Sequence, residues 1–353
     1  MGGFRVALDA LGGRCVFASE VDRHCISNYG QNFKGDRPAG DIRRIDIDQM
    51  PKDYDVLVAG FPCQSFSSSG RRDGLEDTKQ RGNLFREIVR LLKDGHSRPK
   101  GFLLENVRGL MLHDDGNTLA LIVKELEECN YHVRYQLVDA AKILPQERRR
   151  LFLVGIRRDL QQKEGNSYRF PILPDLKRGV QDIIHRAEEE KESLTVNFDS
   201  LILNPNQLQK VKAQKYTQQH PEARFLSDLS RPSKTLQSSY MKYMVGSQFV
   251  PCRGEGSWRR FSAREAARLQ GFPEEFVLCP SRAHHMIGNA VAPPVIAMLA
   301  APLLVCIGCA PPVIMKREDD GWGWEITRTM LVEAMPDDSR REELEQKLHG
   351  VVL

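Results

Sequence analysis

The sequence lacks a strong excess of either charge, so composition alone neither requires nor excludes a polyanionic partner. Its formal net charge is +4 at pH 7 over 353 residues. Apolar residues make up 41% and charged residues 28% of the chain, which is ordinary for a soluble globular protein. A chain of this length can bury a full core, and we expect one large domain with a smaller one beside it.

The chain also lacks a disulfide framework and internal repeats, and we expect no secretion signal. Its 8 cysteines are scattered, and no signal peptide precedes Gly2, which favours a reducing interior over secretion. Cys306 and Cys309 have the spacing of zinc ligands, but neither a second pair nor a histidine cluster accompanies them. We therefore predict no metal site.

Long apolar runs are scarce, and the longest of them is interrupted. Residues 291–315 are largely apolar, but prolines break the run repeatedly, at Pro293, Pro294, Pro302, Pro311 and Pro312. Because proline disfavours helix interiors, we interpret this segment as a buried helix and the chain that follows it. We predict no membrane span and no membrane partner.

The first half of the chain alternates between strand-like and helix-like segments. Strand-like apolar runs lie at residues 15–18, 56–59, 102–104, 132–138 and 150–156, with helical periodicity at 23–29, 84–92 and 118–129. Such alternation predicts an α/β fold with a mostly parallel sheet, helices on both faces and ligands at the carboxyl ends of strands. The alternation ends after residue 158, in a polar, proline-punctuated stretch that we assign to a second domain. Helical periodicity returns at residues 261–270 and ends at Gly271, a residue that favours helix ends.

Cys63 lies in the segment Gly-Phe-Pro-Cys-Gln-Ser-Phe-Ser, residues 60–67, directly after an apolar run. A cysteine at a strand end, held by a preceding proline and followed by a Ser/Gly/Arg-rich loop, is presented to solvent. A thiolate in such a setting is a strong nucleophile. The alternative is a small apolar residue that fills space in the core, as most free cysteines do.

Three further segments carry polar side chains to the same edge of the predicted sheet. Glu105 follows the strand at residues 102–104, and Arg148 and Arg150 alternate onto one face of the next predicted strand. Asn289 begins the late helix. Each has a structural alternative: an ion-paired carboxylate for Glu105, a solvated strand edge for the arginines and a helix cap for Asn289.

Taken together and in this order, these segments closely resemble the cytosine-5 DNA methyltransferase family, over roughly residues 2–300. Supporting matches are Asp41-Ile42, residues 231–235 and residues 264–273. The resemblance implies a Rossmann-like class I methyltransferase fold with a small target-recognition domain. We expect a catalytic domain at residues 1–158 and 261–315, a recognition domain at 159–260 and a charged C-terminal tail at 316–353.

The resemblance implies S-adenosylmethionine as methyl donor and a cytosine in DNA as acceptor. Attack of the Cys63 thiolate on carbon 6 of the ring would make carbon 5 nucleophilic enough to take the methyl group. Glu105 would stabilise the charge that develops on the ring, and Arg150, with Arg148 beside it, would contact the ring carbonyl. The target base must leave the duplex stack to reach such a site.

The resemblance also assigns binding residues, each of which could singly be a core or turn residue. Glu20 would bind ribose hydroxyls, Asp41 the adenine amino group, and Ile42 would pack on the adenine. The expected cofactor residues are Gly3, Phe4, Glu20, Asp41, Ile42, Pro62, Leu84 and Asn289. The residues expected to contact DNA are Ser67, Ser69, Arg71, Arg72 and Arg81, in the loop after Cys63.

The family pattern breaks at the start of the chain. Members of the family open with a strand and a glycine loop, whereas this chain begins at Met1-Gly2-Gly3-Phe4, so the first strand is expected to be truncated. Its absence would leave neighbouring strands with unpaired backbone groups. Two explanations are open: the true start of the protein lies upstream, or the chain is a degenerate relative of the family. We favour the first because the remaining catalytic residues are intact.

Two alternative functions remain open on sequence alone. One is a transfer-RNA cytosine-5 methyltransferase, because residues 239–246 faintly resemble that branch of the family. The other is a catalytically impaired, nucleic-acid-binding pseudoenzyme, which only the shortened start favours. In the leading interpretation we expect a monomer that acts on duplex DNA with a flipped cytosine, inside the cell. Its compartment would be the cytoplasm of a prokaryote, or the nucleus or an organelle of a eukaryote.

Overall fold

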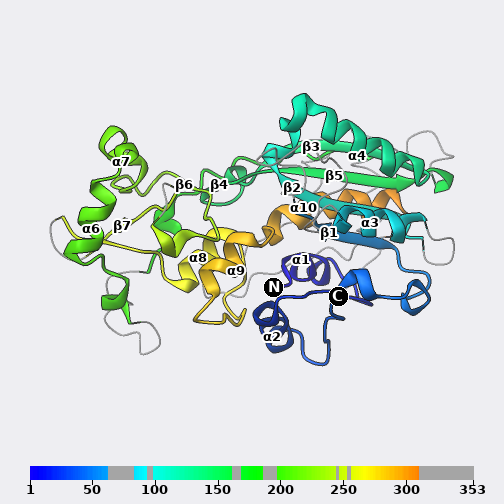
Figure 1. The fold of residues 1–353 in the computed structure, drawn as a ribbon, viewed down its shortest axis with the longest axis horizontal. Helices are drawn as coiled ribbons and strands as arrows, with labels where there is room; N and C mark the ends of the chain where they lie inside the picture. The colour runs from blue at the N-terminus through cyan, green and yellow to red at the C-terminus, as the bar shows by residue number, and fades with distance from the viewer. Residues whose placement is uncertain are drawn as a thin grey trace.

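The computed structural model describes residues 1–62, 83–93, 98–160, 168–185, 197–243, 246–252 and 256–309. Within these residues a central sheet with helices on both faces forms one end of the molecule, and smaller elements form the other (Figure 1). The tail expected at residues 316–353 lies outside the described residues.

The central sheet has the strand order β1-β2-β5-β3. These strands are β1 (Val56–Gly60), β2 (Gly101–Val107), β5 (Arg149–Arg157) and β3 (Tyr131–Asp139). β1 and β2 are parallel, whereas β5 runs antiparallel to both β2 and β3. The expectation of a mostly parallel sheet is therefore corrected to a mixed sheet. The connection from β3 to β5 is too short for the crossover of a dozen or more residues that a parallel pair requires.

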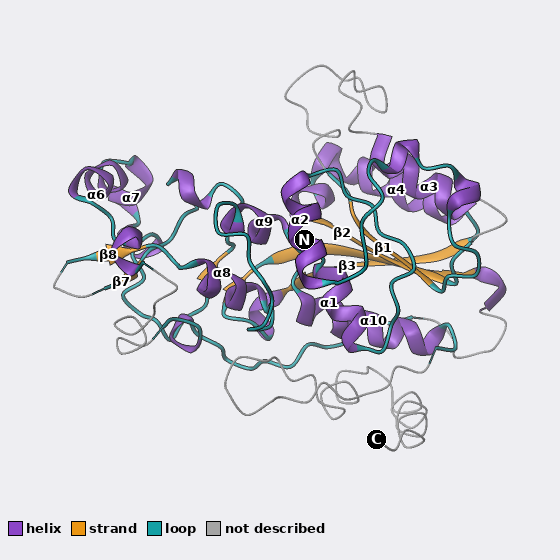
Figure 2. Ribbon diagram, turned by 90° about the horizontal axis from the view of Figure 1, so that it is seen from below, coloured by secondary structure: helices purple, strands orange, loops and turns teal. Residues whose placement is uncertain are grey.

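Alternate residues of the strands feed two separate cores. Leu103, Phe152 and Val154 pack on one face against α1 (Gly3–Ala10) and α10 (Pro293–Cys306). Their neighbours Phe102, Leu104, Leu151 and Leu153 pack on the other face against α3 (Asn83–Lys93) and α4 (Asn117–Glu128). Figure 2 shows the sheet edge-on between the two pairs of helices. The period of two in a strand explains this division, and it confirms the expected α/β layering.

α10 is apolar on all sides because it is covered on all sides. Within the described residues, Ala283–Cys306 is long and apolar enough by composition to cross a membrane, but 83% of its most apolar window is buried inside the protein. Pro293 and Pro294 lie in the first turn of α10, where a backbone N–H group would have no hydrogen-bond acceptor within the helix, so their missing N–H groups cost no helical bond. The structure thus places α10 in the core, as the sequence predicted for a buried helix, while residues 310–315 lie outside the described residues.

The second region consists of short elements around its own small core. That core contains Leu203, Val211, Phe225 and Phe249. Its elements are α6 (Pro205–Lys212), α7 (Lys215–Gln219), β6 (Ser233–Lys234), β7 (Val250–Pro251) and β8 (Trp258–Arg259). β6 pairs in parallel with β4 (Gln146–Glu147), and α8 (Ala263–Gln270) and α9 (Ala283–Asn289) lie between this region and the sheet (Figure 1). The domain boundaries at residues 158 and 260 remain predictions.

Short 3-10 helices complete the described chain. They are η1 (Ile42–Arg44), η2 (Ile47–Gln49), η4 (Arg108–Met111), η5 (His113–Gly116), η6 (Ala140–Lys142), η7 (Arg158–Leu160), η8 (Val180–Asp182), η9 (Phe198–Leu201), η10 (Pro221–Ala223) and η11 (Tyr240–Lys242).

The strand expected at residues 15–18 does not form. Only Ser19 pairs there, in an isolated parallel bridge with Ala39, and Val16 is 51% exposed. Within the described residues β1 pairs with β2 alone, so no strand lies beside this segment to complete a ladder. The helix expected to follow does form, as α2 (Arg23–Asn32), capped by the Asp22 carboxylate.

Candidate active site

The site lies where β1 and β2 end side by side. Gly60, the last residue of β1, is in register with Glu105 of β2. A Cβ atom on Gly60 would lie 3.6 Å from Oε2 of Glu105, so the carboxylate sits against the chain that leads to Cys63. Asn106 donates from Nδ2 to the carbonyl oxygen of Phe61 at 3.0 Å. This bond fixes the chain one residue before Pro62, which is half-buried.

Glu105 is an almost buried carboxylate paired with an arginine. Its side chain is 13% exposed, and its Oε1 lies 3.1 Å from Nε of Arg150 on the adjacent strand β5. Burial raises the pKa of Glu105 above its usual range, although the charges of Arg148 and Arg150 act in the opposite direction. The carboxyl group can therefore hold a proton at a higher pH than an exposed glutamate would.

Arg148 is buried to 3% exposure between β4 and β5. Its Nη2 donates to the carbonyl oxygens of Ala290, at 2.7 Å, and Gly288, at 3.3 Å. Burial lowers the pKa of Arg148 to about 9, which leaves it cationic at neutral pH. Its Nε and Nη1 have no hydrogen-bond partner in the described part of the chain, so two buried donors remain available.

A small cavity joins these three side chains. It has a volume of about 10 Å³, enough for roughly one water molecule, and is lined by Glu105, Ala140, Arg148, Arg150, Phe152, Val291, Ala292 and Val295. Arg149 points away and pairs with Asp139 at 2.8 Å. The structure thus brings Glu105, Arg148 and Arg150 together, in keeping with the alternation expected from the sequence.

The two acidic residues expected at the cofactor, Glu20 and Asp41, follow neighbouring parallel segments. The bridge between Ser19 and Ala39 aligns these segments, and Oγ of Ser19 donates to the carbonyl oxygen of Gly40 at 2.7 Å. Oε1 of Glu20 accepts the backbone N–H groups of the two residues that follow it, at 2.8 and 3.0 Å. These bonds hold the half-buried carboxylate at the end of its segment.

Asp41 is held by its own arginine neighbour. Its carboxylate caps η1 and pairs with the Arg43 guanidinium, which lowers the pKa of Asp41 to about 2. Ile42, half-buried, follows it, and Arg90 of α3 donates from Nη2 to the Ile42 carbonyl oxygen at 3.0 Å. Leu84, also half-buried, lies in the first turn of α3.

The remaining cofactor predictions fall where α1 meets the turn before α10. A Cβ atom on Gly3 would lie 2.9 Å from both Cγ2 and the carbonyl oxygen of Val291, so only glycine allows this approach. Asn289 is exposed at the end of α9, so the expectation that it begins or caps the late helix is wrong: α10 starts only at Pro293, with Ala292 as its N-cap. Phe4, in contrast, packs against the core beneath the sheet, which agrees with its structural alternative.

Six predicted residues lie outside the described part of the chain. They are Cys63 and the expected DNA contacts Ser67, Ser69, Arg71, Arg72 and Arg81. Among the residues that are described, no group of three or more His, Cys, Asp or Glu side chains could hold a metal ion.

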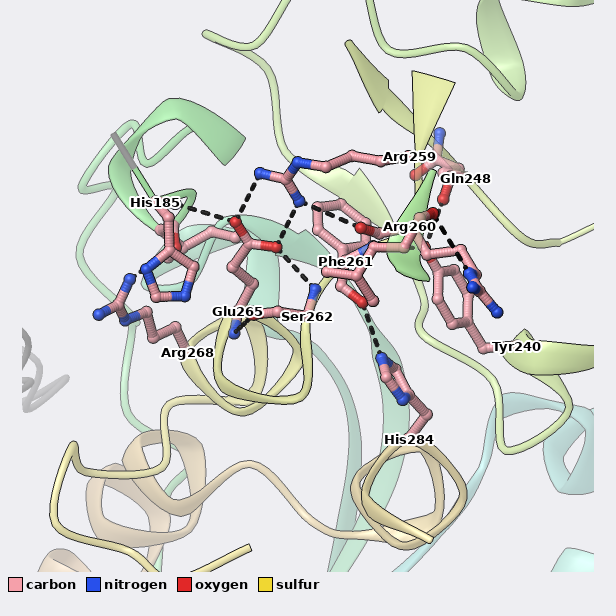
Figure 3. Close-up of polar contacts among 12 residues, drawn as sticks. His185, Tyr240, Gln248, Arg259, Arg260, Phe261, Ser262, Glu265, Arg268 and His284 are labelled. Atoms are coloured by element: carbon pink, nitrogen blue, oxygen red, sulfur yellow. Dashed lines mark hydrogen bonds and ion pairs between the residues drawn. The ribbon is translucent and has the colours of Figure 1, made fainter. Parts of the chain in front are cut away.

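Sequence reasoning missed a buried polar cluster at the start of α8 (Figure 3). Arg259 and Glu265 form a two-pronged ion pair, both bonds 2.8 Å long, with side chains 2% and 0% exposed. Glu265 also accepts the backbone N–H groups of His185, at 2.9 Å, and Ser262, at 2.7 Å. The Ser-x-x-Glu spacing of residues 262–265 indicates a helix N-terminus. It does not indicate that Glu265 also binds the N–H group of His185, which is distant in the sequence.

Comparison with known proteins identifies the class. A family model described as C-5 cytosine-specific DNA methylase matches residues 1–304. The Type II methyltransferase M.DsaV of Dactylococcopsis salina is 37% identical over 309 residues, covering 86% of this chain and 83% of the relative. The Type II methyltransferase M.HhaI of Haemophilus parahaemolyticus is 30% identical over 306 residues, covering 85% of this chain and 90% of the relative.

Solved structures agree on the fold. The S. pombe Dnmt2 methyltransferase superimposes with a TM-score of 0.64 at 17% identity, covering 86% of this chain and 95% of that structure. A putative DNA modification methyltransferase from an E. coli prophage gives a TM-score of 0.57 at 21% identity, covering 87% and 97%. The protein thus has the Rossmann-like fold of a methyltransferase.

The chain belongs to the C-5 cytosine-specific DNA methylase family. It is an enzyme that transfers a methyl group from S-adenosylmethionine to carbon 5 of cytosine in DNA. The transfer-RNA and pseudoenzyme alternatives are not favoured by these relatives.

The residues present fit the adenosine part of S-adenosylmethionine. Glu20 and Asp41 supply hydrogen-bond acceptors at the ends of adjacent segments, as hydroxyl and amino groups require. Ile42 and Leu84 supply apolar surface nearby, since Arg90 ties η1 to α3.

Proposed function

We propose that methyl transfer proceeds through a covalent bond between Cys63 and a cytosine that has left the duplex stack. The observation that carries this proposal is the pairing of Glu105 with Arg150 at 3.1 Å, beside the strand end that leads to Cys63. A carboxyl group with a raised pKa and a guanidinium next to it suit a ring that must accept a proton and a hydrogen bond at once.

Each residue then has one task. The Cys63 thiolate adds to carbon 6, and the electron pair of the 5,6 double bond moves into the ring toward nitrogen 3. Glu105 gives its proton to nitrogen 3, while Arg150 donates to the ring carbonyl and Arg148 keeps positive charge close to both. S-adenosylmethionine, when bound, supplies an electrophilic methyl group to carbon 5. Loss of the carbon-5 proton to solvent water then expels the Cys63 thiolate and restores the 5,6 double bond, and nitrogen 3 returns its proton to Glu105.

The cofactor is held by residues of two groups. Glu20 would accept the ribose hydroxyls and Asp41 the adenine amino group, which requires Asp41 to share its carboxylate with Arg43. Ile42, Pro62 and Leu84 would line the adenine. Gly3 and Asn289 would face the methionine part, from the contact between α1 and the turn before α10, with Phe4 supporting α1 from the core.

The partner is duplex DNA, bound by a monomer. Ser67, Ser69, Arg71, Arg72 and Arg81 would hold the flipped nucleotide and its phosphates, and residues 159–260 would read the target sequence. Two bacterial relatives of this chain are named Type II methyltransferases. These names support a role in restriction-modification, in the cytoplasm of a bacterium.

A covalent trap tests the proposal. The substrate is a long duplex of mixed sequence synthesised with 5-fluorocytosine in place of cytosine, so that any target site carries the analogue. Because fluorine cannot leave as the carbon-5 proton does, the bond between Cys63 and carbon 6 should persist. We expect a complex stable to denaturant whose crosslinked peptide contains Cys63. Absence of a complex, or attachment to another side chain, would refute the mechanism.

Replacement of Glu20 by glutamine tests the cofactor assignment. The amide keeps one acceptor for the backbone but loses the charge that strengthens bonds to ribose hydroxyls, worth about 1.5–3 kcal/mol. We expect the KM for S-adenosylmethionine to rise about 10-fold or more, with kcat nearly unchanged, in methyl-transfer assays at varied donor concentration. The exposed Glu128→Gln on α4 is the control, and an unchanged KM in Glu20→Gln would remove Glu20 from the binding site.

A further inference from the structure

A continuous chain of buried hydrogen bonds connects the second region to Arg148, and it begins at Gln146. This side chain is 0% exposed. Its Oε1 accepts the backbone N–H of Leu236 at 2.8 Å, two residues after β6. Its Nε2 donates to the carbonyl oxygen of Leu269, at 2.9 Å, and to Oε1 of Gln270, at 2.8 Å. One amide thus joins the β4–β6 pair to the end of α8.

The chain continues through Gln270, the last residue of α8, which is also 0% exposed. Its Nε2 donates to the carbonyl oxygen of Ala290 at 2.6 Å. Arg148 donates to the same oxygen at 2.7 Å and to Gly288 at 3.3 Å. The Ala290 carbonyl is therefore the shared acceptor through which Gln270 and Arg148 are connected.

Neither glutamine lines the cavity formed by Glu105, Arg148 and Arg150. Burying two amides in a protein core is costly unless every polar atom is paired, and an apolar residue could fill the same volume. Here the side-chain amides of Gln146 and Gln270 have the hydrogen-bond partners described above. Together these bonds form a chain that ends at the carbonyl group of Ala290. This arrangement indicates a role in holding that carbonyl group in place.

We propose that Gln270 and Gln146 are positioning residues for the methyl-transfer reaction. They fix the Ala290 carbonyl, which holds the Arg148 guanidinium beside Glu105. Through Gln146 they also make the position of this guanidinium depend on the position of residues 233–236. The inference rests on the proposed function of Arg148 at the reacting ring. Neither glutamine contacts the substrate; each acts through Arg148.

The other end of α8 is anchored separately. Glu265, in the first turn, is bound by Arg259 and by the His185 N–H group (Figure 3). Arg268, further along α8, donates to the Ile183 carbonyl oxygen at 3.1 Å. α8 is thus fastened to residues 183–185 and β8 by Glu265 in its first turn and Arg268 in its last turn, and to the candidate active site by its last residue, Gln270. A change at its first turn should weaken the fold without acting directly on Arg148.

A double-mutant cycle with Arg148 tests the proposal. Gln270→Met keeps a similar volume but removes the donor to Ala290, and Arg148→Lys removes the guanidinium. Loss of one buried hydrogen bond, about 1.4 kcal/mol, corresponds to a 10-fold fall in rate. We expect Gln270→Met to lower kcat about 10-fold at saturating donor and DNA, with less than a twofold change in the KM for S-adenosylmethionine. The double variant should be no slower than Arg148→Lys alone, because both changes act through one group.

The outcomes separate the two claims. If Arg148→Lys lowers kcat but Gln270→Met does not, or if their effects multiply, the positioning role is wrong and the proposed function stands. If Arg148→Lys has full kcat, the proposed role of Arg148 fails and the positioning role fails with it. Gln146→Met, one bond further away, should show a smaller fall of the same kind and serves if Gln270→Met does not fold. Glu265→Gln, in the first turn of α8 and far from Arg148 in the hydrogen-bond chain, is the control, with a lower melting temperature and an unchanged kcat.

Discussion

Replacement of Cys63 by serine is expected to abolish methyl transfer while leaving DNA binding intact. A serine hydroxyl remains protonated at neutral pH and, without a base to activate it, cannot add to carbon 6 of the ring. Binding should persist because the change removes one sulfur atom and adds no bulk. Transfer of a tritiated methyl group to a long mixed-sequence duplex measures the first effect, and a gel-shift assay with the same duplex measures the second.

Cys279→Ser is the matched control. Cys279 is a half-buried free cysteine between α8 and α9, and the same chemical change there should leave activity unaltered. Retained transfer in Cys63→Ser would mean that no bond to this sulfur forms during turnover. Loss of activity in both variants would point instead to a general sensitivity of the fold to cysteine replacement.

Replacement of Glu105 by glutamine is expected to lower kcat about 100- to 10,000-fold, the usual contribution of a positioned acid or base. The amide still fits beside Arg150, but it cannot deliver a proton to nitrogen 3 of the ring. Single-turnover methyl transfer measures the change. Glu147→Gln, at an exposed carboxylate one residue from Arg148, is the control and should retain full kcat.

The raised pKa of Glu105 fixes the sign of the pH dependence. Its protonated form persists to a higher pH than in an exposed glutamate, and kcat should fall as pH rises through the folded-state pKa. That alkaline limb should be absent from the residual activity of Glu105→Gln. Stability follows the same sign: the contribution of Glu105 is fully present below its unfolded pKa and is lost as pH rises through the folded pKa. The variant should therefore gain stability relative to the parent protein at alkaline pH, in urea unfolding experiments.

Much of the site could be predicted because its residues follow local patterns. Apolar runs gave β1 and β2, so the parallel ends that bring Gly60 beside Glu105 were foreseeable. Alternation along residues 148–150 predicted two arginines on one side. The helix expected at residues 261–270 forms as α8, Ala263–Gln270, since its capping residues and terminal glycine are local signals.

What could not be predicted depends on partners far apart in the chain. Residues 15–18 have strand-like composition, but a strand also needs a neighbouring strand, and in the described chain the segment beside them forms only the single bridge between Ser19 and Ala39. Gln146 and Gln270 are separated by 124 residues, and nothing in either local sequence indicates that their amides meet. The ion pair of Arg259 with Glu265 is close in sequence, yet its surroundings come from far along the chain: the Arg259 guanidinium lies over the Phe198 ring, and the His185 N–H group bonds Glu265.

The covering of the sheet by α10 has a consequence for synthesis of the protein. The strands that this helix covers, β2, β5 and β3, are complete by residue 157, whereas α10 begins at residue 293. During translation the apolar face of the sheet that α10 covers therefore stays exposed while more than a hundred further residues are synthesised. A nascent chain that stalls or is cleaved in that interval exposes this apolar face to other proteins. Ribosome pausing within the second region should therefore favour aggregation or binding by chaperones.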